Sequence, residues 1–347
     1  MEASPLRCTT PIELRPAQLS RLLGYELPYH RRKELFGMDE PEDGGSRSRK
    51  QYYSPAQVAM YRETHEPGFS LADNPQSVPP VVVTRMTKGG TGKTSFTANG
   101  STILASMGYR VLVIDADSQG SISELFNVDT ENESLLTAMD LFLNGEPLEK
   151  VVIQPFADTS LDLVPGDQFI ARYDSTVMSE RGREKLIQKW FQENQRQLAA
   201  KYDIVMVDTN PASTILNYSL MMAADLIITP VFLDGISLKA IKCIINELEE
   251  IKTEYGVSVP LHFVSNGLHN GWPHTKMNDE QLRLRFKDQV FNKKIPHYVG
   301  FSKQHLPGEA ALPLFLRDTA SSAAWSLVEV AKELAKLLHL RGSSNLL

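Results

Sequence analysis

One short segment sets the strongest limit on what this chain can fold into. Residues 81–95 read VVVTRMTKGGTGKTS, a β-branched run that leads directly into a glycine-rich turn. β-Branched residues favour strands, and glycines let backbone N–H groups curl around an anion. Residues 94–107 continue as a predicted helix, whose positive amino end would face the same anion. The segment therefore predicts a strand, a loop and a helix that together hold phosphate groups.

The chemistry expected of this loop divides among its side chains. Lys93 supplies a positive charge for phosphates, and the Thr94 hydroxyl is a suitable ligand for Mg²⁺. The alternative is a glycine-rich surface turn with two solvated lysines, which requires neither the strand before it nor the helix after it. The positions expected to contact a nucleotide are Lys88, Gly89, Gly90, Thr91, Gly92, Lys93, Thr94 and Ser95.

Downstream of residue 80, short apolar runs alternate with amphipathic stretches. This alternation predicts an α/β fold, a mostly parallel twisted sheet with helices on both faces. Ligands of such sheets bind beyond the carboxyl ends of the strands. The expected strands are residues 81–86, 110–115, 161–164, 203–208, 226–231 and 260–265, and the expected helices are residues 94–107, 181–199, 215–223, 237–255, 278–290 and 321–340.

Composition excludes several classes of protein. A chain of 347 residues is long enough for one large domain and a smaller one. The net charge of −6 means that any binding to nucleic acid depends on local patches. Cys8 and Cys243 lack the spacing of a zinc site or a disulfide framework, and we interpret both as structural thiols. Apolar runs such as residues 225–232 are too short to cross a bilayer, and the first residues lack a signal-peptide core, so we expect a cytoplasmic protein.

A proline-rich stretch, residues 64–80, divides the chain. We expect an N-terminal region at 1–66, a linker at 67–80 and a large domain at 81–347. Upstream, helices at 16–24, 28–36 and 55–64 with a basic hairpin at 44–53 follow the order of a winged helix-turn-helix. Solvated charged faces are the alternative explanation of its cations. The residues predicted to contact DNA are Arg31, Arg32, Lys33, Arg47, Arg49 and Lys50.

Acidic residues end two of the expected strands. The sequence VLVIDADSQGS places Asp115 and Asp117 at the carboxyl edge of the sheet, and YDIVMVDTNPA contains Asp208 at the end of its apolar run. Asp208 stands where a ligand of Mg²⁺ or of its water is needed opposite Thr94. Asp115 or Asp117 could instead cap the helix that follows, as carboxylates at such turns often do.

These motifs together resemble the ParA/MinD family of dimeric ATPases. The loop K-G-G-T-G-K-T is similar to the family's "signature lysine" loop, with Thr87 where a strict phosphate loop has glycine. The segment after Asp115 resembles D-x-D-P-Q-G with Ser118 in place of proline, residues 208–211 fit D-x-x-P, and AADLIITPV matches the family's next strand. The resemblance covers residues 81–340 and implies a P-loop NTPase fold of the SIMIBI type that uses ATP and Mg²⁺.

The resemblance also implies roles for single residues. Lys88, Lys93 and Asp117 would be catalytic, with Asp117 aligning the attacking water, and Asp115 would support the magnesium site or order the loop. Lys88 would reach across an ATP-dependent homodimer to the partner's phosphates; an exposed loop lysine is the alternative. Asn266 would contact adenine, although asparagine is also a common turn residue.

A function follows from this resemblance. We expect a nucleoid-associated DNA partition ATPase that binds DNA as an ATP dimer, is stimulated by a ParB-type partner, and represses its own operator through the N-terminal module. A nucleotide-switched transcriptional regulator is one alternative. A MinD-like positioning ATPase is the other, but the chain ends RGSSNLL and lacks the amphipathic tail of a membrane-cycling protein. The cations expected to meet nonspecific DNA are Arg283, Arg285, Lys287, Lys293, Lys294 and Lys303, unless they are simply solvated.

Overall fold

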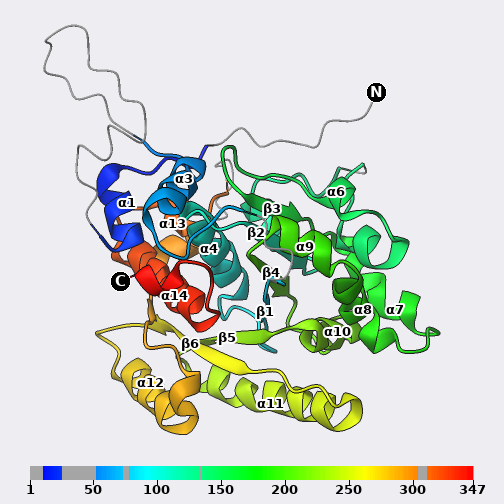
Figure 1. Cartoon of the computed structure of the whole chain (residues 1–347). Helices are drawn as coiled ribbons and strands as arrows, with labels where there is room; N and C mark the ends of the chain where they lie inside the picture. Colours follow the sequence, from blue (N-terminus) through cyan, green and yellow to red (C-terminus); the bar gives the residue numbers. More distant parts are fainter. Residues whose placement is uncertain (1–10, 26–51, 73–77, 133, 304–310, 347) are drawn as a thin grey trace, which may run out of the picture.

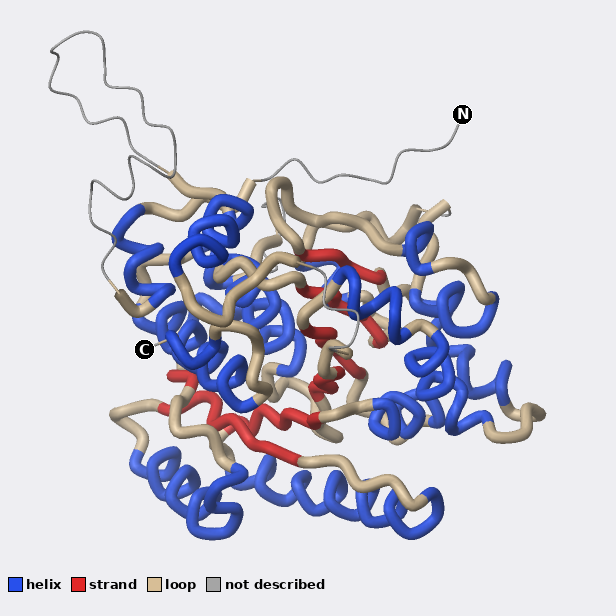
Figure 2. The backbone as a smooth tube through the Cα atoms, in the orientation of Figure 1, coloured by secondary structure: helices blue, strands red, loops and turns tan. Residues whose placement is uncertain are grey.

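A parallel sheet forms the framework of the molecule (Figure 2). The computed structural model describes residues 11–25, 52–72, 78–132, 134–303 and 311–346. Within these residues the sheet has seven strands in the order β3-β2-β4-β1-β5-β6-β7, and all adjacent pairs run parallel. The strands are β1 (Val81–Thr84), β2 (Val111–Ala116), β3 (Leu161–Val164), β4 (Ile204–Thr209), β5 (Leu226–Phe232), β6 (Leu261–Leu268) and β7 (Ile295–Pro296).

Helices cover both faces of this sheet (Figure 1). On one face α4 and α14 lie against the strands, and on the other face α10 and α11 do so. The α-helices are α1 (Pro16–Leu23), α3 (Pro55–His65), α4 (Lys93–Ser106), α5 (Ser121–Leu125), α6 (Leu148–Val151), α7 (Tyr173–Val177), α8 (Leu186–Glu193), α9 (Gln195–Lys201), α10 (Ile215–Ala223), α11 (Gly235–Tyr255), α12 (Pro273–Phe286), α13 (Leu314–Arg317) and α14 (Ser322–Leu337).

The strands are apolar on both sides because each side meets a helical layer. In β1, Val82 belongs to the cluster beneath α4 and α14, whereas Val81 and Val83 belong to the cluster on the opposite face. All four residues of β1 are buried. This two-sided burial explains why the strands read as continuous apolar runs rather than as alternating ones.

The expected α/β class and its parallel sheet are confirmed. Several details differ from the sequence prediction, which did not include the short helices α5, α6, α7 and α13. The helix expected at 181–199 is divided into a 3-10 turn at Arg183–Lys185, α8 and α9, and the backbone leaves helical geometry between α8 and α9 at Asn194, with φ of −100° and ψ of 8°. The helix expected at 278–290 begins earlier, at Pro273, where proline suits a first turn. The two-residue strand β7 was not predicted.

The N-terminal helices pack on the large domain. α1 and α3 match the helices expected at 16–24 and 55–64, and Leu22 and Tyr61 belong to the same apolar cluster as the residues of α4 and α14. The Arg21 guanidinium lies 4.1 Å from the centre of the Trp325 ring. The expected helix at 28–36, nearly all of the expected hairpin at 44–53, and the six cations assigned to DNA there lie outside the described residues.

Within the described part of the chain, none of the helices combines the length and the apolarity needed to cross a bilayer.

Candidate functional site

The glycine-rich loop, residues 88–94, connects β1 to α4 at the carboxyl edge of the sheet. Two of its glycines have left-handed backbone angles, with φ of 71° at Gly90 and 92° at Gly92. A Cβ atom on Gly92 would also lie 2.5 Å from Nδ2 of Asn266. Any other residue at Gly92 would therefore be strained by its positive φ and would displace the end of the Asn266 side chain.

The positive end of this site is formed by Lys93, the first residue of α4. The N-cap residue is Gly92, which has no side chain to accept a hydrogen bond from the backbone N–H groups in the first turn of the helix. Lys93 is only 7% exposed. Burial lowers the pKa of Lys93, while the charges of Asp208 and Asp117 oppose this shift. A desolvated ammonium at an uncapped helix start is suited to a multiply charged anion.

The negative end of the site is Asp208, at the end of β4. Its Oδ2 accepts a hydrogen bond of 2.6 Å from the Thr94 hydroxyl, so the two residues predicted to hold Mg²⁺ lie side by side, and that role stays a prediction. Its Oδ1 is buried and has no hydrogen-bond partner among the described residues. Burial, followed by the charge of Asp115, raises the pKa of Asp208 to about 8. The ionised carboxylate is therefore poorly compensated within the chain and suited to a bound cation.

The residues present fit a Mg²⁺ ion that is held partly by water and phosphate better than a metal ion that is held by protein side chains alone. Nowhere in the described ranges do three His, Cys, Asp or Glu side chains gather in a group able to hold a metal. Mg²⁺ is usually held by one or two protein groups together with water and phosphate oxygens. The Oδ1 atom of Asp208, which has no partner among the described residues, and the nearby Thr94 hydroxyl are suited to this kind of coordination.

Asp115 and Asp117 lie beside this pair. Asp115 is in register with Asp208 on the neighbouring strand. Its carboxylate accepts hydrogen bonds from the backbone N–H of Asp117 and from both the N–H and the hydroxyl of Ser123. Burial raises the pKa of Asp115 to about 6 although these hydrogen bonds oppose the shift. These contacts are those of a residue that orders the loop, one of the two roles expected for Asp115.

Asp117 is 8% exposed, and its Oδ1 accepts a hydrogen bond from the N–H of Gln119. Its charge acts on both Lys93 and Asp208. Asp117 therefore lies close enough to the site for the predicted role in aligning water, and that role stays a prediction.

Lys88 is held within its own chain. Its Nζ donates to Oδ2 of Asp234 at 2.5 Å and to the hydroxyl of Ser237 at 3.3 Å. The side chain keeps 29% of its surface exposed. Burial alone would raise the pKa of Asp234, but hydrogen bonds from Lys88 and Ser237 outweigh it and lower the pKa. Lys88 is thus held by the N-terminal end of α11 in its own chain.

A mostly apolar cavity of about 470 Å³ opens beside the loop. Asn266 lies on its wall and donates a hydrogen bond of 2.8 Å to the carbonyl oxygen of Thr91. The aromatic rings and backbone around it leave room for a planar heterocycle next to the phosphate loop. The lining includes Ser95, Phe96, Phe232, Asn266, Pro296 and Tyr298. The adenine contact predicted for Asn266 is compatible with this position and stays a prediction.

Three of the C-terminal cations expected to bind DNA form ion pairs within the chain. Arg283 and Lys294 both contact Asp279, and Lys293 contacts Glu329. The Arg285 guanidinium lies over the ring of Phe286. Only part of their charge is therefore available to an external phosphate backbone.

Two side chains close to the loop in the chain or in space were not predicted. Arg85, three residues before Lys88, is completely buried, and Asp234 pairs with Lys88. A lone arginine inside the apolar run VVVTRM was an available signal for the first, because a buried charge must find partners. The D-G-I-S sequence marks Asp234 as a helix N-cap, but nothing in it indicates the contact with Lys88.

Comparisons with known proteins agree with this geometry. Residues 80–260, just over half of the chain, match the family model described as "AAA domain". The cell division protein PomZ of Myxococcus xanthus (strain DK1622) is 29% identical over 238 residues, which are 68% of this chain and 72% of PomZ. The chromosome partitioning protein ParA of the same strain is 24% identical over 250 residues, 72% of this chain and 85% of that protein.

Among solved structures, a variant of McdA from Cyanothece in complex with ATP superposes with a TM-score of 0.65 at 15% identity, over 75% of this chain and 97% of McdA. At this identity the likeness concerns the fold. Together with the family match and the strand–loop–helix site built around Lys93, Thr94 and Asp208, these findings show that the chain belongs to the AAA-domain family and, within it, to the ParA family of P-loop ATPases.

Proposed function

We propose that this protein is a partition ATPase that hydrolyses ATP with Mg²⁺ and positions DNA by cycling between an ATP-bound dimer and a monomer. The observation that carries the proposal is the pairing of Thr94 with Asp208, whose second carboxylate oxygen is buried without a partner among the described residues. Bound Mg²⁺ would neutralise charge on the phosphates. Asp208 and Thr94 are the groups that would hold it.

The other residues then have distinct roles. Lys93 and the uncapped start of α4 bind phosphate charge. Asp117 orients a water molecule, and Asp115 keeps its loop in place through Ser123. The apolar cavity beside Asn266 takes the base.

Dimerisation supplies the second lysine. Lys88 leaves Asp234 when the phosphates of a second copy offer more negative charge than one partly exposed carboxylate. Dimers therefore require the γ-phosphate, because two loops with unbalanced lysines would otherwise repel each other.

DNA and a ParB-type adaptor are the proposed partners, in keeping with the relative named as a chromosome partitioning protein. Contact with DNA would run through phosphates, so its affinity should fall steeply with salt. The cations available for this purpose are those of the N-terminal region and the partly paired set Arg283, Arg285, Lys293 and Lys294.

The test is ATP turnover with Mg²⁺, measured with and without DNA and adaptor. The proposal expects turnover to rise when both are added. Lys88→Ala should keep ATP binding but lose the ATP-dependent doubling of mass seen by light scattering. A Lys88→Ala variant that dimerises like the wild type contradicts the shared-lysine arrangement, and turnover that responds to neither partner contradicts a partition role.

A further inference from the structure

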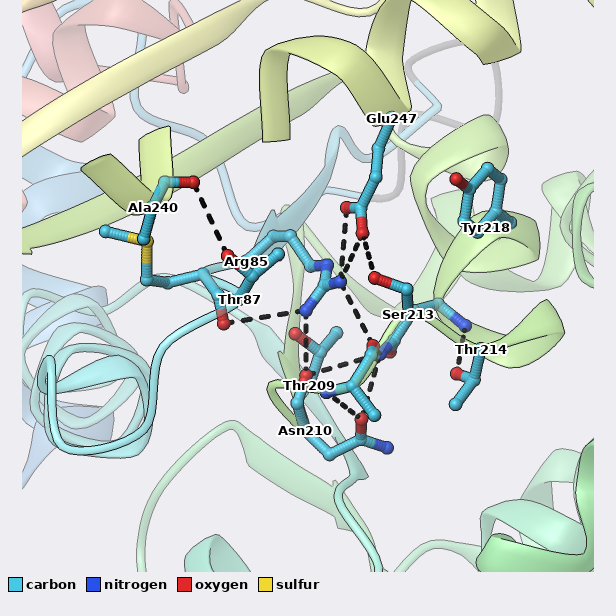
Figure 3. A network of polar contacts seen from close by, with 12 residues as sticks. Arg85, Thr87, Thr209, Asn210, Ser213, Thr214, Tyr218, Ala240 and Glu247 are labelled. Carbon is cyan, nitrogen blue, oxygen red and sulfur yellow. Dashed lines mark hydrogen bonds and ion pairs between the residues drawn. The ribbon is translucent and has the colours of Figure 1, made fainter. Parts of the chain in front are cut away.

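A buried arginine at the centre of a network of polar contacts joins the segment after β4 to α11 (Figure 3). Arg85 follows β1, three residues before Lys88, and its side chain is completely buried. Its guanidinium makes two contacts with Glu247 of α11, at 2.9 and 3.1 Å. It also donates to the carbonyl oxygens of Asn210 and Ala212, each at 3.0 Å.

The carbonyl oxygens bound by Arg85 belong to one short segment. Residues 210–213 follow β4 and begin two residues after Asp208. Ser213 donates its hydroxyl to the same carboxylate of Glu247, and Asn217 of α10 donates to the Ala212 carbonyl at 2.6 Å. Residues 211–213 are exposed to solvent. This largely exposed segment, residues 210–213, is thus held in place by the buried ion pair of Arg85 and Glu247.

Stability alone does not explain this pair. Burying an arginine and a glutamate costs desolvation that apolar residues of similar size avoid. The carbonyls of an exposed segment can bind water instead, so they do not need an arginine to satisfy them. What the pair adds is position, because a planar guanidinium fixes several acceptors at once.

We propose that Arg85 and Glu247 are positioning residues for hydrolysis, which hold residues 210–213 and thereby fix the direction of Asp208 toward the phosphate loop. This inference rests on the proposed function, since the reaction it serves is ATP hydrolysis. The N-cap residue of the same helix, α11, is Asp234, the intrachain partner of Lys88. The segment after β4 and the side chain of Lys88 are therefore both attached to α11.

The experiment replaces the ion pair by apolar residues in the double variant R85M/E247L. Arg62 and Glu66 form the matched control, because Arg62 is also fully buried, pairs with a glutamate and donates to two carbonyl oxygens, those of Met107 and Gly342. The control variant is R62M/E66L. Both are compared with the wild type in binding of a fluorescent ATP analogue, in turnover at saturating ATP and Mg²⁺, and in hydrogen exchange of the segment after β4 without nucleotide.

The inference expects R85M/E247L to lower the turnover rate by about tenfold or more, with an analogue Kd within about threefold of the wild type. Exchange of residues 210–213 should quicken by about tenfold. The control variant should leave the turnover rate and the exchange of residues 210–213 unchanged, even where it lowers the melting temperature. If R85M/E247L does not fold, Glu247→Gln carries the test and should shift turnover and exchange in the same direction.

Wild-type turnover in R85M/E247L, or a loss of turnover explained fully by weaker binding of the analogue, overturns the inference. Unchanged exchange of residues 210–213 overturns it as well. Failure of the proposed function has a separate signature, since the wild type itself would then show no turnover, whereas the exchange comparison still tests whether Arg85 and Glu247 hold the segment.

Discussion

At the scale of single residues, the site is a set of buried charges that are not balanced within the chain. Lys93 has its pKa lowered by burial, and Asp208 has its pKa raised to about 8. Both shifts show that the fold by itself disfavours the ionised forms that a magnesium–nucleotide complex requires. The binding energy of the ligand must therefore offset a cost already built into the fold.

Asp208→Asn should separate function from stability. The amide keeps the shape of the side chain but removes the buried charge, so the free energy of unfolding without nucleotide should be higher in the variant by on the order of 1 kcal/mol or more. Turnover with Mg²⁺ should fall by about a hundredfold or more because the cation loses its carboxylate. Denaturant unfolding and a phosphate-release assay measure the two effects. A variant that is less stable and still active would contradict the role assigned to Asp208.

The carboxylates of the site could be predicted from sequence because strand ends are easy to recognise. Asp115 and Asp208 each end an apolar run, and parallel strands bring such ends to one edge. Asp234 and Glu247 could not be predicted in this way. Their partners, Lys88 and Arg85, are 146 and 162 residues away in the chain. A local sequence pattern does not indicate which acidic residue of a long helix pairs with which distant cation.

At the scale of elements, α11 holds the loop lysine within its own chain. Asp234 caps the helix by accepting from the N–H of Ser237 and also pairs with Lys88. The elements themselves were largely predictable: α10 has the bounds expected from its apolar spacing. The division of residues 181–199 was not, because neither glycine nor proline stands beside Asn194 to mark the break between α8 and α9.

Asp234→Asn should favour the dimer. Asparagine still caps α11, but it no longer attracts the Lys88 ammonium by charge, so Lys88 is released more readily to a second copy. The pair is partly exposed and worth about 0.2–1 kcal/mol, so dimers should form at ATP concentrations up to about fivefold lower. Light scattering across an ATP titration measures this. Glu249→Gln removes the same charge from an exposed position of α11 and serves as the control; an equal shift in both variants would argue against the Lys88 contact.

The strand β6 contains a titratable group that should make stability depend on pH. Burial lowers the pKa of His262 below its ordinary 6.5, with Glu333 opposing the shift. The folded state therefore binds the proton less tightly than the unfolded state. This contribution to stability is complete above pH 6.5 and is lost as the pH falls from that value through the lower pKa of the folded state.

His262→Gln should remove that dependence. The melting temperature of the wild type should drop between about pH 7 and 5 by more than that of the variant. Calorimetry at matched ionic strength gives the comparison. Parallel curves for the two proteins would show that His262 does not titrate differently in the folded state.

At the scale of the whole molecule, the described N-terminal helices and the ATPase domain share one apolar core. Leu22 and Tyr61 pack in the cluster that includes α4 and α14, and the Arg62 guanidinium donates to the carbonyl of Met107, just beyond the end of α4. The proline-rich composition predicted a linker that begins at residue 67. It could not predict that the helices before this linker pack against α4 and α14, because a proline-rich stretch indicates a loop but not which surfaces it brings together.

Leu22→Ala should therefore destabilise the entire protein. The loss of a fully buried leucine side chain costs about 2–5 kcal/mol, and the effect should appear as a lower melting temperature of a single unfolding transition. Differential scanning calorimetry measures it, and Leu284→Ala, at a position 71% exposed, should change little. Two separate transitions, of which only one responds to Leu22→Ala, would show that the N-terminal helices unfold independently.

The position of β1 between β4 and β5 also bears on how the protein is made. Val81 pairs with Val205, and Val82 pairs with Leu226. A ribosome therefore releases the glycine-rich loop long before it releases either neighbouring strand, and a nascent chain that stops short of β5 has the loop without its support. Because such distant pairing is slow to form, newly made protein should acquire the ability to retain nucleotide late in synthesis, in one step, when β1 is enclosed on both sides.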